Sequence, residues 1–169
     1  RLIETFTLEI GIKIASCAST TLKSQLTNRG IEPDECYYIR NEAAVRGKDS
    51  IDLETDPPPD LAVEIEVTTR WIDRKKVYAA LGIPEVWSHD GQALTVYILQ
   101  EDGEYAASES SAALPMLPIS GLAPFIDGPA VEDGEEDIYL VPYVTSHEVS
   151  VYEHCVAALE ASLGTGPHG

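Results

Sequence analysis

A segment in the middle of the chain, residues 56–69, alternates between apolar and acidic side chains and constrains the fold more than any other part. Three prolines stop the preceding segment, and the period-two alternation of a β-strand begins directly after them. The apolar side chains of this predicted strand point to one face, and the other face carries Asp60, Ala62, Glu64 and Glu66. Successive side chains on one face lie about 6.5–7 Å apart. Ionised carboxylates at this spacing are unfavourable unless a cation or protons neutralise them, and Mg²⁺ prefers such oxygens, so the segment points to a metal-dependent hydrolytic site.

The length and composition fit one soluble globular domain with a buried core. The chain has 169 residues, of which 44% are hydrophobic and 24% charged. No apolar run approaches the roughly 18–20 residues that span a bilayer, so we expect no membrane-spanning segment. Because the chain begins at Arg1 instead of methionine, we expect the domain to be truncated at its N-terminus.

The cysteines and histidines predict neither a disulfide framework nor a zinc site. Cys17, Cys36 and Cys155 are odd in number, widely spaced and without a Cys-x-x-Cys pair. The four histidines do not supply the missing ligands at a useful spacing. This pattern favours reduced thiols and a cytoplasmic protein.

The charge is strongly negative and unevenly spread. Residues 1–76 hold all 11 basic and 14 acidic residues, a formal charge of −3, whereas residues 77–169 hold 15 acidic residues and no basic one, a formal charge of −15. An acidic surface repels nucleic acid, so a DNA site would lie near the N-terminal basic residues or depend on metal ions. We expect weak DNA binding, with modest salt dependence, on the side that bears Arg46, Lys48, Arg70, Arg74, Lys75 and Lys76. The alternative that the acidity serves only solubility stays open.

Periodicity and breakers predict an α/β or α+β fold with a central sheet and helices packed on it. We expect a helix up to Glu9 that Gly11 ends, a helix over 71–81 that Gly82 caps, and a hairpin at Asp90-Gly91. Residues 19–29 read as irregular and residues 41–56 as a long polar connection. The predicted strands cover 12–17, 36–39, 60–67, 85–89, 94–99 and a stretch near Tyr105. We divide the chain into a domain over 1–129 and an extension over 130–169, with an acidic loop at 132–137, a helix at 147–163 and a disordered tail.

Two Pro-Asp pairs open strands, at Pro33-Asp34 and at Pro59-Asp60. If these strands pair in antiparallel fashion, Asp34 lies close to Glu64 and Glu66. One Asp that meets a Glu-x-Glu from its neighbour is a workable Mg²⁺ site. The helix that follows brings basic side chains toward the same region: Arg74, Lys75 and Lys76.

Each of these features also has a purely structural interpretation. The acidic row is typical of the solvent-exposed face of an edge strand. The basic run is typical of a solvent-exposed helix face. Asp60 is equally suited to capping a turn after the prolines. Tyr78 and Trp87 are expected to pack in the core and not to stack on bases.

Longer motifs resemble those of the Uma-two family of restriction-endonuclease-like proteins, over roughly residues 16–126. That resemblance implies the PD-(D/E)xK nuclease superfamily, an α/β fold in which helices flank a mixed central sheet. It assigns Asp34 as the motif Asp and Glu64 as the acidic member of (D/E)xK. The resemblance rests on Glu32-Pro33-Asp34-Glu35-Cys36-Tyr37-Tyr38-Ile39, Arg46-Gly47-Lys48, Pro59-Asp60-Leu61-Ala62-Val63-Glu64-Ile65, Asp73-Arg74 and Tyr78-Ala79-Ala80-Leu81-Gly82-Ile83-Pro84-Glu85-Val86-Trp87.

The chain departs from the superfamily pattern at the motif lysine. Glu66 stands at that position, and the helical lysine that replaces it in such families falls near Arg74. Arginine binds phosphate or a negative transition state, but it cannot act as a base. For the acidic residue that an upstream helix contributes, the candidates are Glu4 and Glu9.

The sequence therefore predicts an endonuclease that hydrolyses DNA with Mg²⁺ or Mn²⁺. The expected catalytic residues are Asp34, Glu64, Glu66, Arg74 and Lys76, and the expected metal ligands are Asp34, Asp60, Glu64 and Glu66. The alternative is a nuclease fold without activity that serves as an interaction module or as an acidic decoy that mimics DNA. Homodimer formation is left open.

Overall fold

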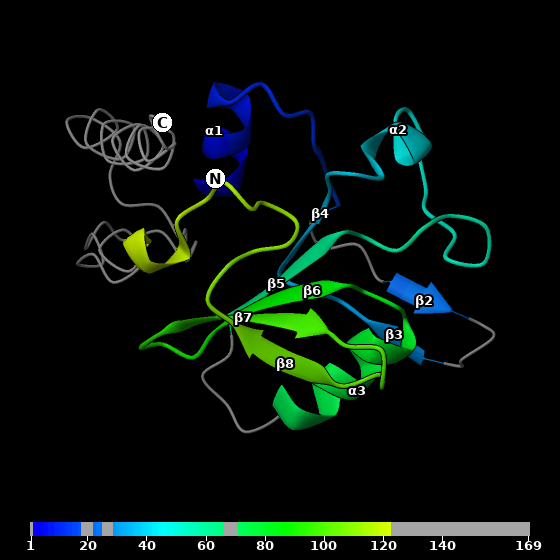
Figure 1. Cartoon of the computed structure of the whole chain (residues 1–169). Coiled ribbons are helices and arrows are strands. Elements are labelled where there is room, and N and C mark those ends of the chain that lie inside the picture. The colour runs from blue at the N-terminus through cyan, green and yellow to red at the C-terminus, as the bar shows by residue number, and fades with distance from the viewer. Residues whose placement is uncertain (1, 18–21, 25–28, 66–70, 123–169) are drawn as a thin grey trace, which may run out of the picture.

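The computed structural model describes residues 2–17, 22–24, 29–65 and 71–122 of the chain (Figure 1). The expected acidic loop, C-terminal helix and tail lie outside the described residues, as does the boundary expected after residue 129. Glu66 and Arg70 also lie outside them.

A six-stranded mixed sheet forms the centre of the fold, in the order β1-β4-β5-β6-β7-β8. Strands β5 and β6 are parallel, and every other neighbouring pair in this sheet is antiparallel. This architecture confirms the expected α/β fold with a mixed central sheet flanked by helices. The sheet contains β1 (Ala15–Ser16), β4 (Glu35–Tyr38), β5 (Leu61–Ile65), β6 (Glu85–His89), β7 (Leu94–Leu99) and β8 (Tyr105–Ser108). The other elements are β2 (Leu22–Ser24), β3 (Arg29–Ile31), α1 (Leu2–Glu9), α2 (Glu42–Val45), α3 (Trp71–Ala80) and a 3-10 turn (Ile119–Gly121).

Helices α1 and α3 lie on opposite sides of the sheet (Figure 1). One hydrophobic cluster joins Ile3 and Phe6 of α1 to one face of the sheet. A second cluster joins Tyr78 of α3 to Ala62 and Val86 on the other face. The parallel strands β5 and β6 need a crossover connection, and α3 provides it. The face of β5 that carries Ala62 and Glu64 is therefore covered by a helix.

Glycines at positive φ end two elements where the sequence predicts it. Gly82 follows α3 at φ +73°, and the N–H of Ile83 donates to the carbonyl of Tyr78 over 3.1 Å. Gly91 in the β6–β7 turn has φ +89°. The Asp90 carboxylate accepts the backbone N–H groups of residues 92 and 93, and these bonds lower its pKa. The predicted bounds of β6 and β7 are confirmed.

One prediction about the connections is wrong. Part of the segment expected to be irregular forms the antiparallel hairpin β2–β3, since Leu22 and Ile31 pack into the α3 cluster. The predicted polar connection includes the short helix α2. Burial of a few apolar side chains stabilises the β2–β3 hairpin. A short stretch of sequence does not show which surface of the protein will cover those side chains.

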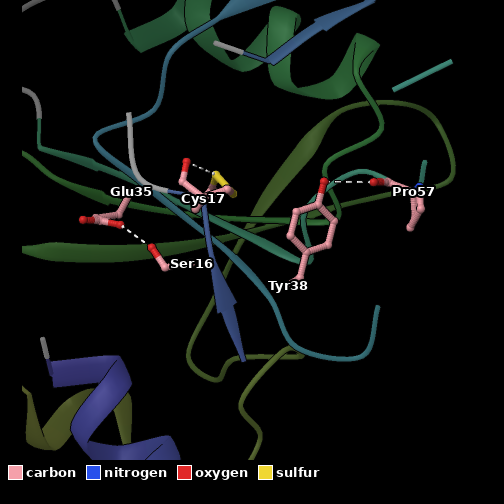
Figure 2. The surroundings of a disulfide bond; sticks show 6 residues. Ser16, Cys17, Glu35, Tyr38 and Pro57 are labelled. Atoms are coloured by element: carbon pink, nitrogen blue, oxygen red, sulfur yellow. Dashed lines mark hydrogen bonds between the residues drawn. A yellow bond between two sulfur atoms is a disulfide. The ribbon is translucent and has the colours of Figure 1, made fainter. Parts of the chain in front are cut away.

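The expectation of reduced cysteines is wrong for two of them. Cys17 and Cys36 form a disulfide, with Cα atoms 5.2 Å apart (Figure 2). Strand β1 pairs with β4 so that Ser16 faces Tyr37, and this register brings the two cysteines opposite each other. The N–H of Cys17 also donates to the carbonyl of Cys36 over 2.9 Å. The cysteine pattern therefore no longer supports a reducing compartment.

Loss of this disulfide is expected to lower the free energy of unfolding by about 2–4 kcal/mol, because the cross-link restricts the unfolded chain. We expect this decrease for Cys17→Ser, measured by urea unfolding without reductant. Cys155→Ser is the matched control and should unfold like the wild type. Equal stabilities of the two variants would show that the cross-link does not form in solution.

Within the described part of the chain, no helix combines the length and apolar character needed to cross a bilayer.

Candidate functional site

Asp34 and Glu64 meet where β4 begins and β5 ends. The antiparallel register pairs Glu35 with Val63, which places Asp34 opposite Glu64. The N–H of Ile65 donates to Asp34 Oδ2 over 2.7 Å and fixes one oxygen of the exposed carboxylate. The structure has the antiparallel pairing of these two strands that the sequence analysis took as a condition.

Glu64 is a buried carboxylate on a central strand. Its exposed fraction is 2%, and β5 lies between β4 and β6. The edge-strand interpretation of the acidic row is therefore wrong for Glu64. A buried carboxylate needs hydrogen bonds or a cation to offset its lost hydration, and both come from α3.

Arg74 and Tyr78 of α3 donate to the same carboxylate oxygen. Arg74 Nη2 and the Tyr78 hydroxyl both bond Glu64 Oε1. The two donors are four residues apart on the helix and thus lie on one side of it. Arg74 Nη2 also donates to the carbonyl of Glu32 over 2.9 Å.

Sequence reasoning assigned Tyr78 to the core and missed its hydroxyl. The side chain is fully buried, as expected, yet its oxygen contacts the candidate site. The signal that could have found it is the spacing of four residues from Arg74. A phenol on the buried side of a helix usually needs a polar partner, and the nearest acidic strand offered one.

Lys76 is not brought to Glu64. It is exposed, and it lies two positions after Arg74, on a different side of the helix. Lys75 Nζ lies 3.6 Å from the centroid of the Tyr97 ring on β7. The structure joins the predicted helical cation Arg74 to Glu64 in an ion pair.

Asp60 lies at the other end of β5 and holds a turn. Its buried carboxylate accepts the N–H groups of Ile39 and Asn41 over 2.7 and 2.9 Å, and the Asn41 amide over 3.0 Å. Four residues of strand, about 13 Å, separate it from Glu64. The geometry thus favours the turn-capping alternative for Asp60 and does not place this residue with the predicted metal ligands.

Arg46 and Lys48 also belong to the Asp60 end of the strands. Arg46 Nε donates to Glu42 Oε1 over 2.8 Å, and Lys48 pairs with Asp56. These hydrogen bonds lower the pKa values of the Glu42 and Asp56 carboxyls. Both cations come from the connection between β4 and β5, so they do not line the Asp34–Glu64 end as expected.

Glu4 lies on the opposite face of the sheet from Glu64. The Tyr37 hydroxyl donates to Glu4 Oε1 over 3.3 Å, and Tyr37 faces the α1 cluster. Burial raises the pKa of the neighbouring Glu35 carboxyl, while a hydrogen bond from Ser16 opposes this shift. The structure therefore does not bring Glu4 to the site, and Glu9 is exposed.

The donor set at Asp34 and Glu64 suits a hard divalent cation. Asp34, which directly precedes β4, and Glu64 on the neighbouring strand β5 offer carboxylate oxygens, the type of ligand that Mg²⁺ prefers. The described residues contain no group of three or more acidic, histidine or cysteine side chains that could hold a metal. The Glu64 carboxylate already forms an ion pair with a cationic group, the guanidinium of Arg74.

Comparison with known proteins gives one family and one short local similarity. The model of the family described as "Uma2: Putative restriction endonuclease" matches residues 1–125. The cyclic beta-(1,2)-glucan synthase NdvB of Rhizobium meliloti (strain 1021) is 45% identical over 47 residues, which is 27% of this chain and 2% of that protein. Because the chain spans so little of that protein, the similarity does not transfer its activity.

Proposed function

The chain belongs to the Uma2 family, and on this premise we propose that it is an endonuclease that hydrolyses DNA phosphodiester bonds with Mg²⁺ or Mn²⁺. The observation that carries the proposal is the position of Asp34 opposite Glu64, beneath the helix that bears Arg74. Carboxylates on adjacent strands with a cationic side chain above them form an arrangement suited to phosphoryl chemistry.

In this proposal each residue has a distinct role. Asp34 and Glu64 would hold the metal, and Glu66 would assist directly or through water. Bound Mg²⁺ would polarise the scissile phosphate and lower the pKa of an attacking water. Arg74 would stabilise the negative charge that develops on the phosphate, since it cannot accept a proton at neutral pH. Tyr78 would keep the Glu64 carboxylate in place.

Two of the six basic residues that were expected to contact DNA lie away from the site. Arg46 and Lys48 are engaged at the other end of the strands, which leaves Arg70 and the α3 cations to contact phosphates. Fewer phosphate contacts mean weaker binding and a shallower dependence on salt. We propose that metal ions supply part of the charge neutralisation. We also propose that the protein forms a homodimer.

Cleavage of supercoiled plasmid tests this function. We expect nicked and linear products with Mg²⁺ or Mn²⁺ and none with a chelator. Glu64→Gln is expected to lower the cleavage rate at least about 100-fold, because it removes a charged metal ligand. Cleavage that persists with the chelator, or at the wild-type rate in Glu64→Gln, would contradict the proposal, as would intact plasmid under all conditions.

The alternative is a module that kept the nuclease fold without its chemistry, or a decoy that mimics DNA. Two observations favour it: the guanidinium of Arg74 lies on the Glu64 carboxylate, and residues 77–169 carry a formal charge of −15. A decoy should bind a basic protein without metal and lose this binding at high salt. Reversal of Lys75 and Lys76 to Glu should weaken DNA binding by a nuclease but leave a decoy's binding to a basic protein intact.

A further inference from the structure

The guanidinium of Arg74 is only partly satisfied by its contacts. A single nitrogen, Nη2, donates to both Glu64 Oε1 and the Glu32 carbonyl. The Nε atom is buried and has no hydrogen-bond partner among the described residues. A guanidinium carries five N–H donors, and its hydrogen bonds to the described residues all come from Nη2. The side chain is 31% exposed and can therefore reach toward solvent and a ligand.

Tyr78 holds the same carboxylate oxygen in a different way. Its side chain is fully buried within the cluster between α3 and the sheet, and its hydroxyl is neutral. The two donors on Glu64 Oε1 therefore differ in kind. One is a fixed neutral hydroxyl, and the other is a charged, half-buried side chain.

A metal ion on Glu64 and the guanidinium on the same carboxylate would repel each other. Like charges a few ångströms apart repel strongly where water shields them only in part, and a divalent ion increases this repulsion. A released guanidinium could present paired N–H groups to a phosphate, the geometry in which arginine binds phosphates best.

We propose that Arg74 is an exchangeable counter-cation of Glu64, which the metal displaces and which then binds the scissile phosphate, while Tyr78 keeps the carboxylate in position. This inference rests on the proposed function, because it concerns the same metal. It makes Arg74 a competitor of the metal in the free protein and a ligand of the substrate in the complex. A purely structural ion pair would instead support the site, and its loss would weaken metal binding.

Calorimetric titration with Mn²⁺ separates these two roles. We expect Arg74→Gln to bind Mn²⁺ about tenfold more tightly than the wild type, because a competing positive charge is removed. Lys76→Gln removes the same charge from an exposed position two residues away, so its affinity should stay within about twofold. Tyr78→Phe should bind roughly tenfold more weakly, because a partner that orients the ligand is lost. Circular dichroism verifies that each variant is folded.

The outcomes distinguish the inference from the function on which it rests. Weaker or unchanged Mn²⁺ binding by Arg74→Gln, with clear binding by the wild type, overturns the inference and leaves the proposed function standing. Absence of Mn²⁺ binding by the wild type and by Arg74→Gln overturns both.

A measurement on the wild type keeps the test valid if Arg74→Gln does not fold. In protein labelled with ¹⁵N-arginine, the Nε–H signal of Arg74 can be assigned by comparison with Arg74→Lys. We expect saturating Mg²⁺ to speed solvent exchange of this proton, since the displaced guanidinium leaves its buried position. An Arg74 signal that Mg²⁺ leaves unchanged contradicts displacement.

Discussion

Replacement of Glu85 by alanine is expected to lower the free energy of unfolding by about 4 kcal/mol. This carboxylate is 1% exposed and lies on β6. Its Oε1 accepts Trp87 Nε1 and the Ser111 hydroxyl, both at 2.6 Å, and its Oε2 accepts the N–H groups of Ala112 and Ala113, both at 2.8 Å. Alanine would leave four donors without their partner, and a buried unpaired donor costs about 1–3 kcal/mol. Water that enters the space offsets part of the sum.

Urea unfolding followed by circular dichroism measures this effect. Glu85→Gln keeps the shape and one acceptor oxygen, so we expect a smaller decrease of about 2 kcal/mol. Glu101→Ala changes an exposed carboxylate and serves as the matched control, with an expected change within about 0.5 kcal/mol. If Glu85→Ala is as stable as this control, the hydrogen bonds to residues 111–113 do not form in solution.

Replacement of Asp34 by asparagine is expected to weaken Mn²⁺ binding about 100-fold and to leave the fold intact. Asparagine retains an oxygen that can accept the N–H of Ile65, and the side chain is exposed, so little stability is lost. The negative charge that attracts the metal disappears. Loss of a residue that merely orients a ligand costs 10–100-fold in metal affinity, so loss of the ligand itself should reach about the upper end of that range.

The position of Asp34 opposite Glu64 follows from local signals once β4 and β5 are taken to pair in antiparallel fashion. Each Pro-Asp pair marks the start of a strand, and antiparallel pairing then places the first residue of one strand beside the last residues of the other. The alternation after the prolines correctly predicted which side chains of β5 lie on each face of the sheet. The Gly82 cap and the Asp90-Gly91 turn likewise follow from residues that act within a few positions of their own.

The sequence did not show which surface covers each face. Asp60 and Glu64 share the predicted acidic row, yet one caps a turn and the other lies beneath α3. That difference depends on where the helix crosses the sheet, and no pattern within β5 encodes it. The same applies to Cys17 and Cys36, which become neighbours only because β1 pairs with β4 across the intervening hairpin. The odd number of cysteines gave no indication that these two would form a disulfide.

Titration with Mn²⁺, followed by the electron paramagnetic resonance signal of the free ion, tests the central claim that Asp34 and Glu64 form a metal site. The samples are the wild type, Asp34→Asn and Asp49→Asn, the last of which removes an equal charge from an exposed position on the connection between β4 and β5. We expect saturable Mn²⁺ binding by the wild type and by Asp49→Asn, and binding about 100-fold weaker by Asp34→Asn. Equal Mn²⁺ affinity in all three proteins, or no binding by the wild type, would contradict the central claim.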